Sequence, residues 1–397
     1  MPLFSYALTG GTIFDGACFH ERHAVIIRNG IIESLVCDSA LPAAFPRIHA
    51  EGALIAPGFV DVQINGCGGV MFNDAPTPET LRVMADTNLR SGCTAFLPTL
   101  ITASDTEMRK AMAVVDQWLE THEASPVLGL HLEGPYISTA RKGIHDRTKI
   151  TTLSPSMRDT LAAFAQKIPL LLTLAPECVA ENDIRMLSDA GVVIALGHSD
   201  ATYEEALCGV NAGAKAATHL FNAMSPWQGR YPGMTGAMLD SPEIHCGLIA
   251  DGHHVHYASL GLAKRLKGDS CFLVTDATAP VGTNKTAFSF CGENVFVQNG
   301  KVVNADGTLG GSLLTMIEAV GNCVRHMGWD LGETLRMASL YPAKLMGYDS
   351  HLGKIAPGCR ASLALFRADS FTMTATVENG VFHRWHDGKA YVPEGRE

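Results

Sequence analysis

The pattern of apolar and polar residues changes twice along the chain. Residues 1–55 and 353–397 contain short apolar runs around turn residues, including Asn29-Gly30 and Asn379-Gly380, which favour tight β-hairpins. Between these two parts, short apolar runs alternate with longer amphipathic segments. Such alternation predicts parallel strands that are joined by crossover helices.

The central part, residues 56–352, is long enough for one (β/α)8 barrel. The strands expected there include residues 59–65, 94–99, 127–133, 192–197, 215–218, 246–250 and 272–275. The helices expected there include residues 78–91, 105–121, 155–166, 181–189, 201–211, 258–266 and 331–337. We therefore predict an α/β fold with a TIM-like barrel over residues 56–352. A small β-sandwich domain is expected from both termini, residues 1–55 and 353–397, and an Asn299-Gly300 hairpin is expected late in the barrel.

Four apolar runs end in residue types that bind metals or carry protons. The runs end at Glu133, His198, His219 and Asp276. In a (β/α)8 barrel the carboxyl ends of the strands meet at one mouth, where such enzymes build their active sites. A buried carboxylate is costly unless a cation receives it. The sequence therefore predicts a metal site made by Glu133, His198 and His219.

A carboxylate with two imidazoles is the kind of ligand set found in catalytic zinc sites that keep one open position. One strand-end histidine alone would more often be structural, but the whole set favours a site. A metal lowers the pKa of its water toward about 7, and some group must still move the proton. We predict Asp276 for that role, with a turn-capping aspartate as the alternative.

The first barrel strand ends in Gln63 and Asn65, where many barrel metallohydrolases carry His-x-His and a second metal. Amides bind divalent transition metals poorly, so we expect one divalent ion per subunit, with Zn²⁺ the first choice. A His-x-His does occur at His254 and His256, but it lies in a loop. For His254 we favour a substrate contact over metal ligation.

Arg230 lies in a loop after the strand that leads to His219. An arginine fork matches phosphate or carboxylate, although an isolated arginine would usually be a solvated surface charge. Close to Asn222, Ala223 and His254, it would form an anion-binding site. His145, in the loop after Glu133, is expected to place another imidazole over the mouth.

Composition excludes several classes of function. The 397 residues are 47% hydrophobic and 18% charged, which is typical of a globular protein with a large core. The net charge is −10 without a basic run, which disfavours nucleic acid and anionic membranes as partners. Eleven scattered cysteines without a CxxC pair suit reduced thiols. With neither a signal-peptide pattern nor a membrane-spanning run, we expect a cytoplasmic protein.

Seven motifs follow one another along the chain. They are Pro-Gly-Phe-Val-Asp-Val-Gln-Ile-Asn-Gly at 57–66, His-Leu-Glu-Gly-Pro at 131–135, Lys-Gly-Ile-His at 142–145, Gly-His-Ser-Asp-Ala-Thr at 197–202, Thr-His-Leu-Phe-Asn-Ala-Met at 218–224, Ala-Asp-Gly-His-His-Val at 250–255 and Val-Thr-Asp-Ala-Thr-Ala-Pro at 274–280. Together they resemble the N-acetylglucosamine-6-phosphate deacetylases of the amidohydrolase superfamily. The Gln63 and Asn65 pair resembles the single-metal branch, and residues 225–227 depart most from the family pattern.

The resemblance implies hydrolysis of N-acetylglucosamine 6-phosphate to glucosamine 6-phosphate and acetate, in amino-sugar catabolism, usually by a homodimer. It implies that Glu133, His198 and His219 bind the metal and that Asp276 and His145 are catalytic. The residues that it implies for substrate binding are His145, Asn222, Ala223, Arg230, His254, Leu309, Gly310 and Gly311.

Several alternatives remain open at this point. The nearest is a deacetylase for another acetylamino sugar phosphate, such as N-acetylgalactosamine 6-phosphate. A deaminase or cyclic amidohydrolase of the same superfamily is disfavoured by the missing His-x-His of the first strand. A non-enzymatic scaffold is disfavoured by the intact set of expected metal ligands. His254 or Arg230 would act either in its own subunit or across a dimer interface.

Overall fold

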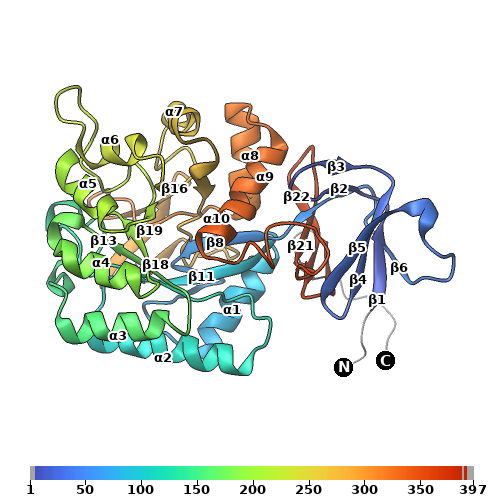
Figure 1. Ribbon diagram of the computed structural model, residues 1–397, viewed down its shortest axis with the longest axis horizontal. Helices are drawn as coiled ribbons and strands as arrows, with labels where there is room; N and C mark the ends of the chain where they lie inside the picture. The colour runs from blue at the N-terminus through green and yellow to red at the C-terminus, as the bar shows by residue number, and fades with distance from the viewer. Residues whose placement is uncertain (1–4, 387–388, 391–397) are drawn as a thin grey trace. The chain divides into compact units, whose positions relative to one another are not determined.

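The computed structural model describes residues 5–386 and 389–390 (Figure 1). Its contacts divide the chain into two compact units. One unit holds the residues up to 61, residues 85–95 and those from 316 onward, and the other holds residues 62–84 and 96–315. The domain boundaries expected from the sequence, at residues 56 and 352, stay a prediction. In the part of the chain described, no helix has the length and apolar character needed to cross a membrane.

The first unit contains two β-sheets. One sheet has the strand order β5-β4-β1-β6, all from the N-terminal segment. Its strands are β1 (Ser5–Thr9), β4 (His23–Arg28), β5 (Ile31–Cys37) and β6 (Arg47–His49). The other has the order β24-β23-β22-β21-β7-β2-β3. Its strands are β2 (Thr12–Phe14), β3 (Phe19–His20), β7 (Leu54–Pro57), β21 (Leu363–Arg367), β22 (Thr372–Glu378), β23 (Val381–His386) and β24 (Lys389–Ala390).

The second of these sheets joins the two ends of the chain, because β7 pairs antiparallel with β21 from Leu54 opposite Phe366 to Pro57 opposite Leu363. Apolar side chains from both sheets, including Leu8 and Leu365, are buried in one common core. This arrangement confirms the predicted β-sandwich from both termini. The same unit also contains α8 (Met316–Met327), α9 (Leu331–Ala338) and α10 (Leu340–Leu345).

Within the described residues, eight parallel strands follow one another in the order β17-β16-β15-β14-β13-β12-β11-β8. They are β8 (Phe59–Ile64), β11 (Cys93–Ile101), β12 (Leu130–Glu133), β13 (Leu170–Leu174), β14 (Val193–Leu196), β15 (Ala216–Ala217), β16 (His245–Leu248) and β17 (Cys271–Leu273). A parallel bridge between Ile64 and Ala277 joins the two edges of this sheet. The predicted TIM-like barrel is therefore confirmed.

Helices alternate with these strands and lie on the outside of the barrel, as Figure 1 shows for α2 to α5. They are α1 (Pro78–Leu89), α2 (Asp105–Thr121), α3 (Pro155–Ala165), α4 (Glu181–Asp189), α5 (Tyr203–Asn211), α6 (Gly233–Asp240) and α7 (Tyr257–Lys267). Capping boxes at Ser104 and Thr202 fix where α2 and α5 begin. The expected helices agree with the observed ones to within two residues at either end, and 105–121 and 181–189 match at both ends.

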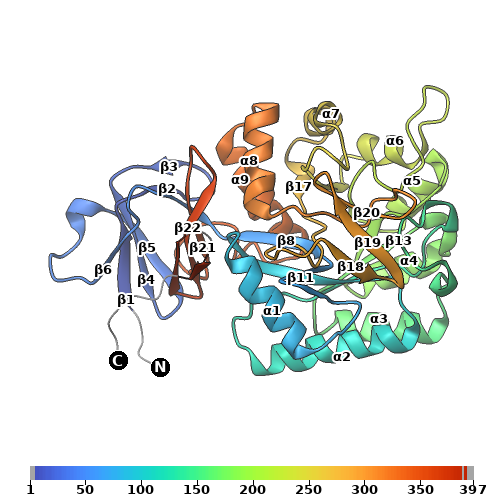
Figure 2. The same cartoon turned by 180° about the vertical axis from the view of Figure 1, so that it is seen from behind.

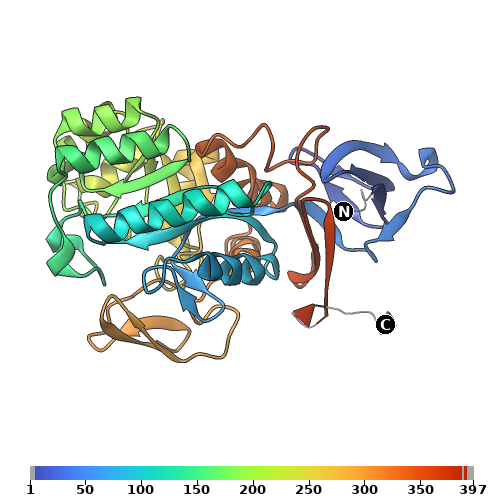
Figure 3. The ribbon, with the colours of Figure 1, turned by 90° about the horizontal axis from the view of Figure 1, so that it is seen from below.

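A small antiparallel sheet extends from the barrel late in the chain (Figure 2). It consists of β18 (Ala287–Phe290), β19 (Glu293–Gln298) and β20 (Lys301–Asn304). Asn299 and Gly300 connect β19 to β20 with φ of 52° and 75°, which confirms the expected hairpin. The sheet lies beside the β9–β10 hairpin (Gly66–Cys67 and Val70–Met71), as Figure 3 shows. Phe290 and Met71 share a core with Ile144, so the small sheet packs against the loop that follows β12.

Candidate metal centre

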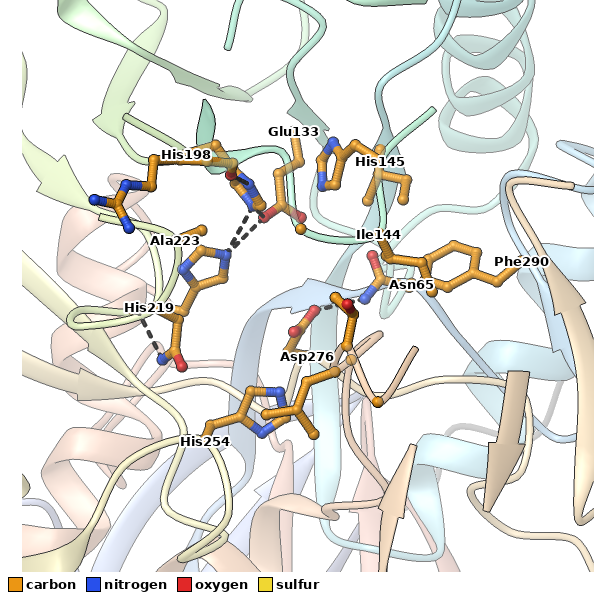
Figure 4. Close-up of a pocket in the computed structure, with 18 of the residues that line it drawn as sticks. Asn65, Glu133, Ile144, His145, His198, His219, Ala223, His254, Asp276 and Phe290 are labelled. Carbon is orange, nitrogen blue, oxygen red and sulfur yellow. Dashed lines mark hydrogen bonds and ion pairs between the residues drawn. The ribbon is translucent and has the colours of Figure 1, made fainter. Parts of the chain in front are cut away.

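Three side chains from different strands meet at the mouth of the barrel (Figure 4). Glu133 is the last residue of β12, and His198 and His219 each lie two residues beyond their strands, β14 and β15. Oε1 of Glu133 is 3.0 Å from Nε2 of each histidine, and the two Nε2 atoms are 3.1 Å apart. All three side chains are buried, so residues far apart in sequence form one compact ligand set.

The orientation of His198 is fixed from its other ring nitrogen. Nδ1 lies 2.9 Å from the backbone oxygen of Arg141, which can only accept, so Nδ1 carries the proton. Nε2 is then left with its lone pair toward Glu133 and His219. A second hydrogen bond joins His198 to the loop after β12, because the Ser138 N–H donates to the His198 carbonyl over 2.8 Å. Such support of the second nitrogen is typical of metal-binding histidines.

The donor set fits a divalent cation. Burial raises the pKa of Glu133, but the neighbouring imidazoles of His198 and His219 outweigh it and hold this pKa well below its usual range. Glu133 is therefore an ionised carboxylate in a buried site, next to imidazole nitrogens that face one another. A cation between these atoms would satisfy the carboxylate and both lone pairs at once.

His131 lies two residues before the expected ligand Glu133 but is itself not a metal ligand. It points to the same side of β12 as Glu133 but lies deeper in the barrel, where it is buried. Nδ1 is 3.2 Å from Oγ1 of Thr99, and Nε2 is 2.8 Å from Oγ1 of Thr173. Burial lowers the pKa of His131 to about 4. Because threonines satisfy both ring nitrogens, His131 is a neutral structural histidine.

Three of the four residues predicted at the strand ends have backbone torsions in the left-handed region. The φ angles are 49° at His198, 32° at His219 and 53° at Asp276. This region is costly for residues other than glycine and persists where the surrounding structure holds it. Parallel pairing on both sides holds β14 and β15, which lead to His198 and His219, and β17, which leads to Asp276, pairs with β16. Each tight turn after a strand directs its side chain into the mouth.

Asp276 lies beside the ligand set and is held by amides of the first strand. Nδ2 of Asn65 donates to Oδ1 of Asp276 over 2.6 Å. Nε2 of Gln63 is 3.2 Å from both carboxylate oxygens of Glu133 and 3.4 Å from Oδ1 of Asp276. Burial, followed by the charge of Glu133, raises the pKa of Asp276 to about 6. A carboxylate with such a pKa is suited to both taking and giving a proton.

Two further imidazoles face the cavity, each oriented by one partner. Nδ1 of His145 is 2.7 Å from Oγ1 of Thr102, and burial holds the pKa of His145 well below its usual range. Nδ1 of His254 is 2.6 Å from Oδ2 of Asp251. Thr102 and Asp251 were not expected from the sequence. For Asp251 the sequence did hold an indication of its contact with His254, because the two residues lie three positions apart in one loop.

These groups line a cavity of about 430 Å³. Its walls include Asn65, Ile101, Glu133, Arg141, Ile144, His145, His198, His219, Asn222, Ala223, His254, Asp276, Phe290, Thr308, Leu309 and Gly311. The structure thus brings together the expected ligands, Asp276, His145, Asn222, Ala223, His254, Leu309 and Gly311. The apolar residues Ile101, Ile144 and Phe290 and the cationic Arg141 were missed, because no motif marks which loop residues turn inward.

Arg230 and Gly310 are not among the residues that line this cavity. Gly310 packs close to the side chain of Ile144, while its neighbours Leu309 and Gly311 reach the cavity. Arg230 is exposed and borders a separate cavity of about 550 Å³, together with Tyr231 and Arg141. The role of Arg230 and Gly310 in substrate binding therefore stays a prediction.

Comparison with known proteins places this geometry in a family. The model of the Amidohydrolase family matches residues 54–387, and that of the NagA composite domain matches residues 5–55. The chain is 39% identical to N-acetylglucosamine-6-phosphate deacetylase from Haemophilus influenzae, over 94% of this chain and 98% of that protein. It is 35% identical to N-acetylgalactosamine-6-phosphate deacetylase from Shewanella sp., over 90% and 91%. A crystal structure of N-acetylglucosamine-6-phosphate deacetylase from Pasteurella multocida superposes with a TM-score of 0.93, at 41% identity, covering 96% of this chain and all of that one.

Removal of one expected ligand tests the metal centre. We expect His219→Ala to lower the divalent metal bound by the purified protein from about one ion per chain to well below one, because two donors hold such an ion poorly. Elemental analysis by mass spectrometry measures both the amount and the identity of the metal. The matched control is His254→Ala, which removes a cavity histidine that is held by Asp251. Equal metal content in the wild type and His219→Ala would contradict the assignment.

Proposed function

Since the chain belongs to the amidohydrolase family, among its N-acetylglucosamine-6-phosphate deacetylases, we propose that it hydrolyses the acetamide of N-acetylglucosamine 6-phosphate. The products are glucosamine 6-phosphate and acetate. The observation that carries this proposal is the convergence of Glu133, His198 and His219 beside Asp276, at the mouth of the barrel. The cavity of about 430 Å³ has the size of a small-molecule site.

Glu133, His198 and His219 would hold one divalent ion, and a mixed set of one carboxylate and two imidazoles suits Zn²⁺. Such an ion supplies a Lewis acid for the acetyl carbonyl and lowers the pKa of water. Gln63 and Asn65 point their amide nitrogens at carboxylates, as assigned by their hydrogen bonds. This orientation supports a single ion, because neither amide nitrogen is a metal ligand.

Asp276 is the proton carrier in this proposal. It takes the proton of the attacking water and then delivers a proton to the departing sugar nitrogen. The short hydrogen bond from Asn65 fixes the carboxylate, which supports a defined position during both transfers. His145 stays neutral because it is buried. With Thr102 donating to its Nδ1, His145 would present an N–H to the developing oxyanion.

The substrate contacts follow from the cavity wall. His254 is oriented by Asp251, and Asn222 is tied down because its Nδ2 donates to the carbonyl of His219 over 3.1 Å. His254, Asn222 and the Ala223 backbone would bind the sugar phosphate, and Leu309 and Gly311 would line the sugar. Binding the phosphate away from the amide positions the carbonyl for attack.

A homodimer would account for Arg230, which lies outside its own cavity. The loop that carries it also exposes Trp227 and Tyr231, with 52% and 74% of their surfaces accessible. Large exposed aromatic side chains are enriched where proteins associate. In this proposal the loop lies at the dimer interface and Arg230 contacts the substrate of the partner subunit.

The eleven cysteines, all without disulfides, support a reducing compartment such as the cytoplasm.

Acetate release from N-acetylglucosamine 6-phosphate tests the reaction directly. We expect the metal-loaded protein to release one acetate per glucosamine 6-phosphate formed, measured by coupled assay and by mass spectrometry. N-Acetylgalactosamine 6-phosphate, offered in the same mixture, tests the alternative that the Shewanella relative suggests. A higher kcat/KM for the galactosamine compound would replace the proposed substrate, and no acetate from either compound would reject the deacetylase.

Replacement of Asp276 tests the proton carrier. We expect Asp276→Asn to lower kcat by at least roughly a hundredfold, because an amide cannot accept and return the proton. The metal content should stay near that of the wild type, since Asp276 is not in the ligand set. Asp269→Asn, on the exposed surface, is the matched control. Near-normal turnover by Asp276→Asn with its metal bound would exclude this role.

Mixed dimers test whether Arg230 acts across subunits. Arg230→Gln and Asp276→Asn proteins should each be weakly active alone. After denaturation and refolding together, the mixed dimer would hold one site with both Asp276 and the partner's intact arginine. We then expect recovery of about a quarter of the wild-type activity. A monomeric protein in light scattering, or no recovery on mixing, would contradict the proposed arrangement.

A further inference from the structure

We propose that Asn65 binds the substrate, by accepting a hydrogen bond from the N–H of the acetamide group that is hydrolysed. This inference rests on the function proposed above and adds a residue that would select an amide over an ester. Asn65 directly follows β8, the first strand of the barrel, and its side chain lines the cavity that contains Glu133 and Asp276.

The oxygen of the Asn65 amide is without a partner, although its nitrogen has one. Nδ2 donates to Oδ1 of Asp276 over 2.6 Å, and Figure 4 shows the amide with this nitrogen toward Asp276. Oδ1 is buried and makes no hydrogen bond within the described residues. Buried amide oxygens are almost always paired, because an unpaired one is costly. An orphaned acceptor on a side chain of the cavity wall therefore indicates a donor on the ligand.

Backbone hydrogen bonds fix Asn65 relative to Asp276. The Asn65 N–H donates to the carbonyl of Ala277 over 3.0 Å, and the Asn65 carbonyl accepts from the N–H of Phe72 over 2.8 Å. One position earlier on each segment, the Asp276 N–H donates to the Gln63 carbonyl over 2.9 Å. Because the backbone and Nδ2 are both held, the amide is already oriented. Binding a ligand to Oδ1 then costs little side-chain freedom.

A glycine lies beside this amide. Gly311 lines the cavity and has a φ of 77°. A Cβ at this position would lie 3.5 Å from Nδ2 of Asn65 and only 2.5 Å from Cγ2 of Thr278. A larger residue would therefore crowd the amide, so glycine leaves room for a ligand next to it.

The position of Asp276 indicates which substrate donor reaches Asn65. Asp276 delivers a proton to the acetamide nitrogen as the C–N bond breaks, so this nitrogen must come within hydrogen-bond reach of its carboxylate. Oδ1 of Asn65 is two bonds from the Nδ2 atom that contacts the same carboxylate. A nitrogen placed for Asp276 thus has its own hydrogen close to Oδ1. It keeps that hydrogen and gains the second one from Asp276, which gives the primary amine of the product.

Such a contact would distinguish amides from esters. Nε2 of Gln63, the other amide at the end of β8, lies near the carboxylates of Glu133 and Asp276, and Gln63 is not part of the cavity wall. Asn65 is therefore the one of this pair that can select the substrate. An acetate ester has an oxygen without hydrogen in place of the N–H, so two acceptors would face each other unpaired. A site built to pair with an N–H disfavours the analogue that lacks it.

Equilibrium binding in the Asp276→Asn protein tests this contact apart from the chemical step. The amide introduced there keeps an oxygen that can accept from Asn65, and turnover is slow. With the metal bound, calorimetry gives Kd for N-acetylglucosamine 6-phosphate and for its ester analogue, 2-O-acetylglucose 6-phosphate. We expect the added change Asn65→Leu to raise Kd for the amide roughly tenfold and Kd for the ester by less than about twofold, because only the amide loses a partner.

Asn65→Asp in the same background keeps an oxygen acceptor and should retain the preference for the amide. Asn65→Ala repeats the test if Asn65→Leu does not fold. The matched control is Asn182→Leu, on the exposed surface of α4.

Two results would overturn the inference. One is an unchanged Kd for the amide in Asn65→Leu. The other is an equal rise in Kd for amide and ester, with or without loss of metal, since Asn65 would then contact a hydroxyl group or act through the metal centre. The failure of the wild type to release acetate would instead reject the proposed function, so the two failures are distinct.

Discussion

A negative charge buried at the barrel mouth is the constraint on which the site depends. Glu133 is 2% exposed, and without compensation its ionised form would destabilise the fold. The chain surrounds it with two imidazole nitrogens and the amide of Gln63. Together with Glu133 itself, these groups come from four strands, so the barrel must close correctly before the charge is satisfied. The candidate metal site and the folding of the barrel are thus linked through one side chain.

Most of the architecture could be predicted because it follows from local rules. Alternation of apolar runs with amphipathic segments gave the barrel, and the Asn-Gly pairs gave the hairpins at Asn29, Asn299 and Asn379. The strand-end residues were found because parallel strands must share one mouth. The pairing of β7 with β21 joins the two ends of the chain. The similar pattern of short apolar runs and turns in both terminal parts could only suggest this pairing.

What the sequence could not show was which loop residues turn inward. Arg230 carried a stronger signal than Arg141, because it lies in a glycine-rich loop close to His219 and Asn222. The structure places Arg141 in the cavity wall and Arg230 outside it. Direction in a loop depends on tertiary hydrogen bonds, here from His198 to the Arg141 carbonyl and from Arg141 to Asp200. Such contacts leave no periodic pattern to detect.

The left-handed backbone at His198, His219 and Asp276 restricts which side chains can occupy these positions. Asparagine, aspartate and histidine tolerate this conformation far better than β-branched residues do. The main chain therefore selects small polar or imidazole side chains before any ligand is present. Glu133 ends an extended strand, so this backbone restriction does not apply to it. The substitutions that the site can accept during evolution are thereby restricted. Its two histidines can be replaced by few residue types, whereas the carboxylate on β12 is constrained by charge alone.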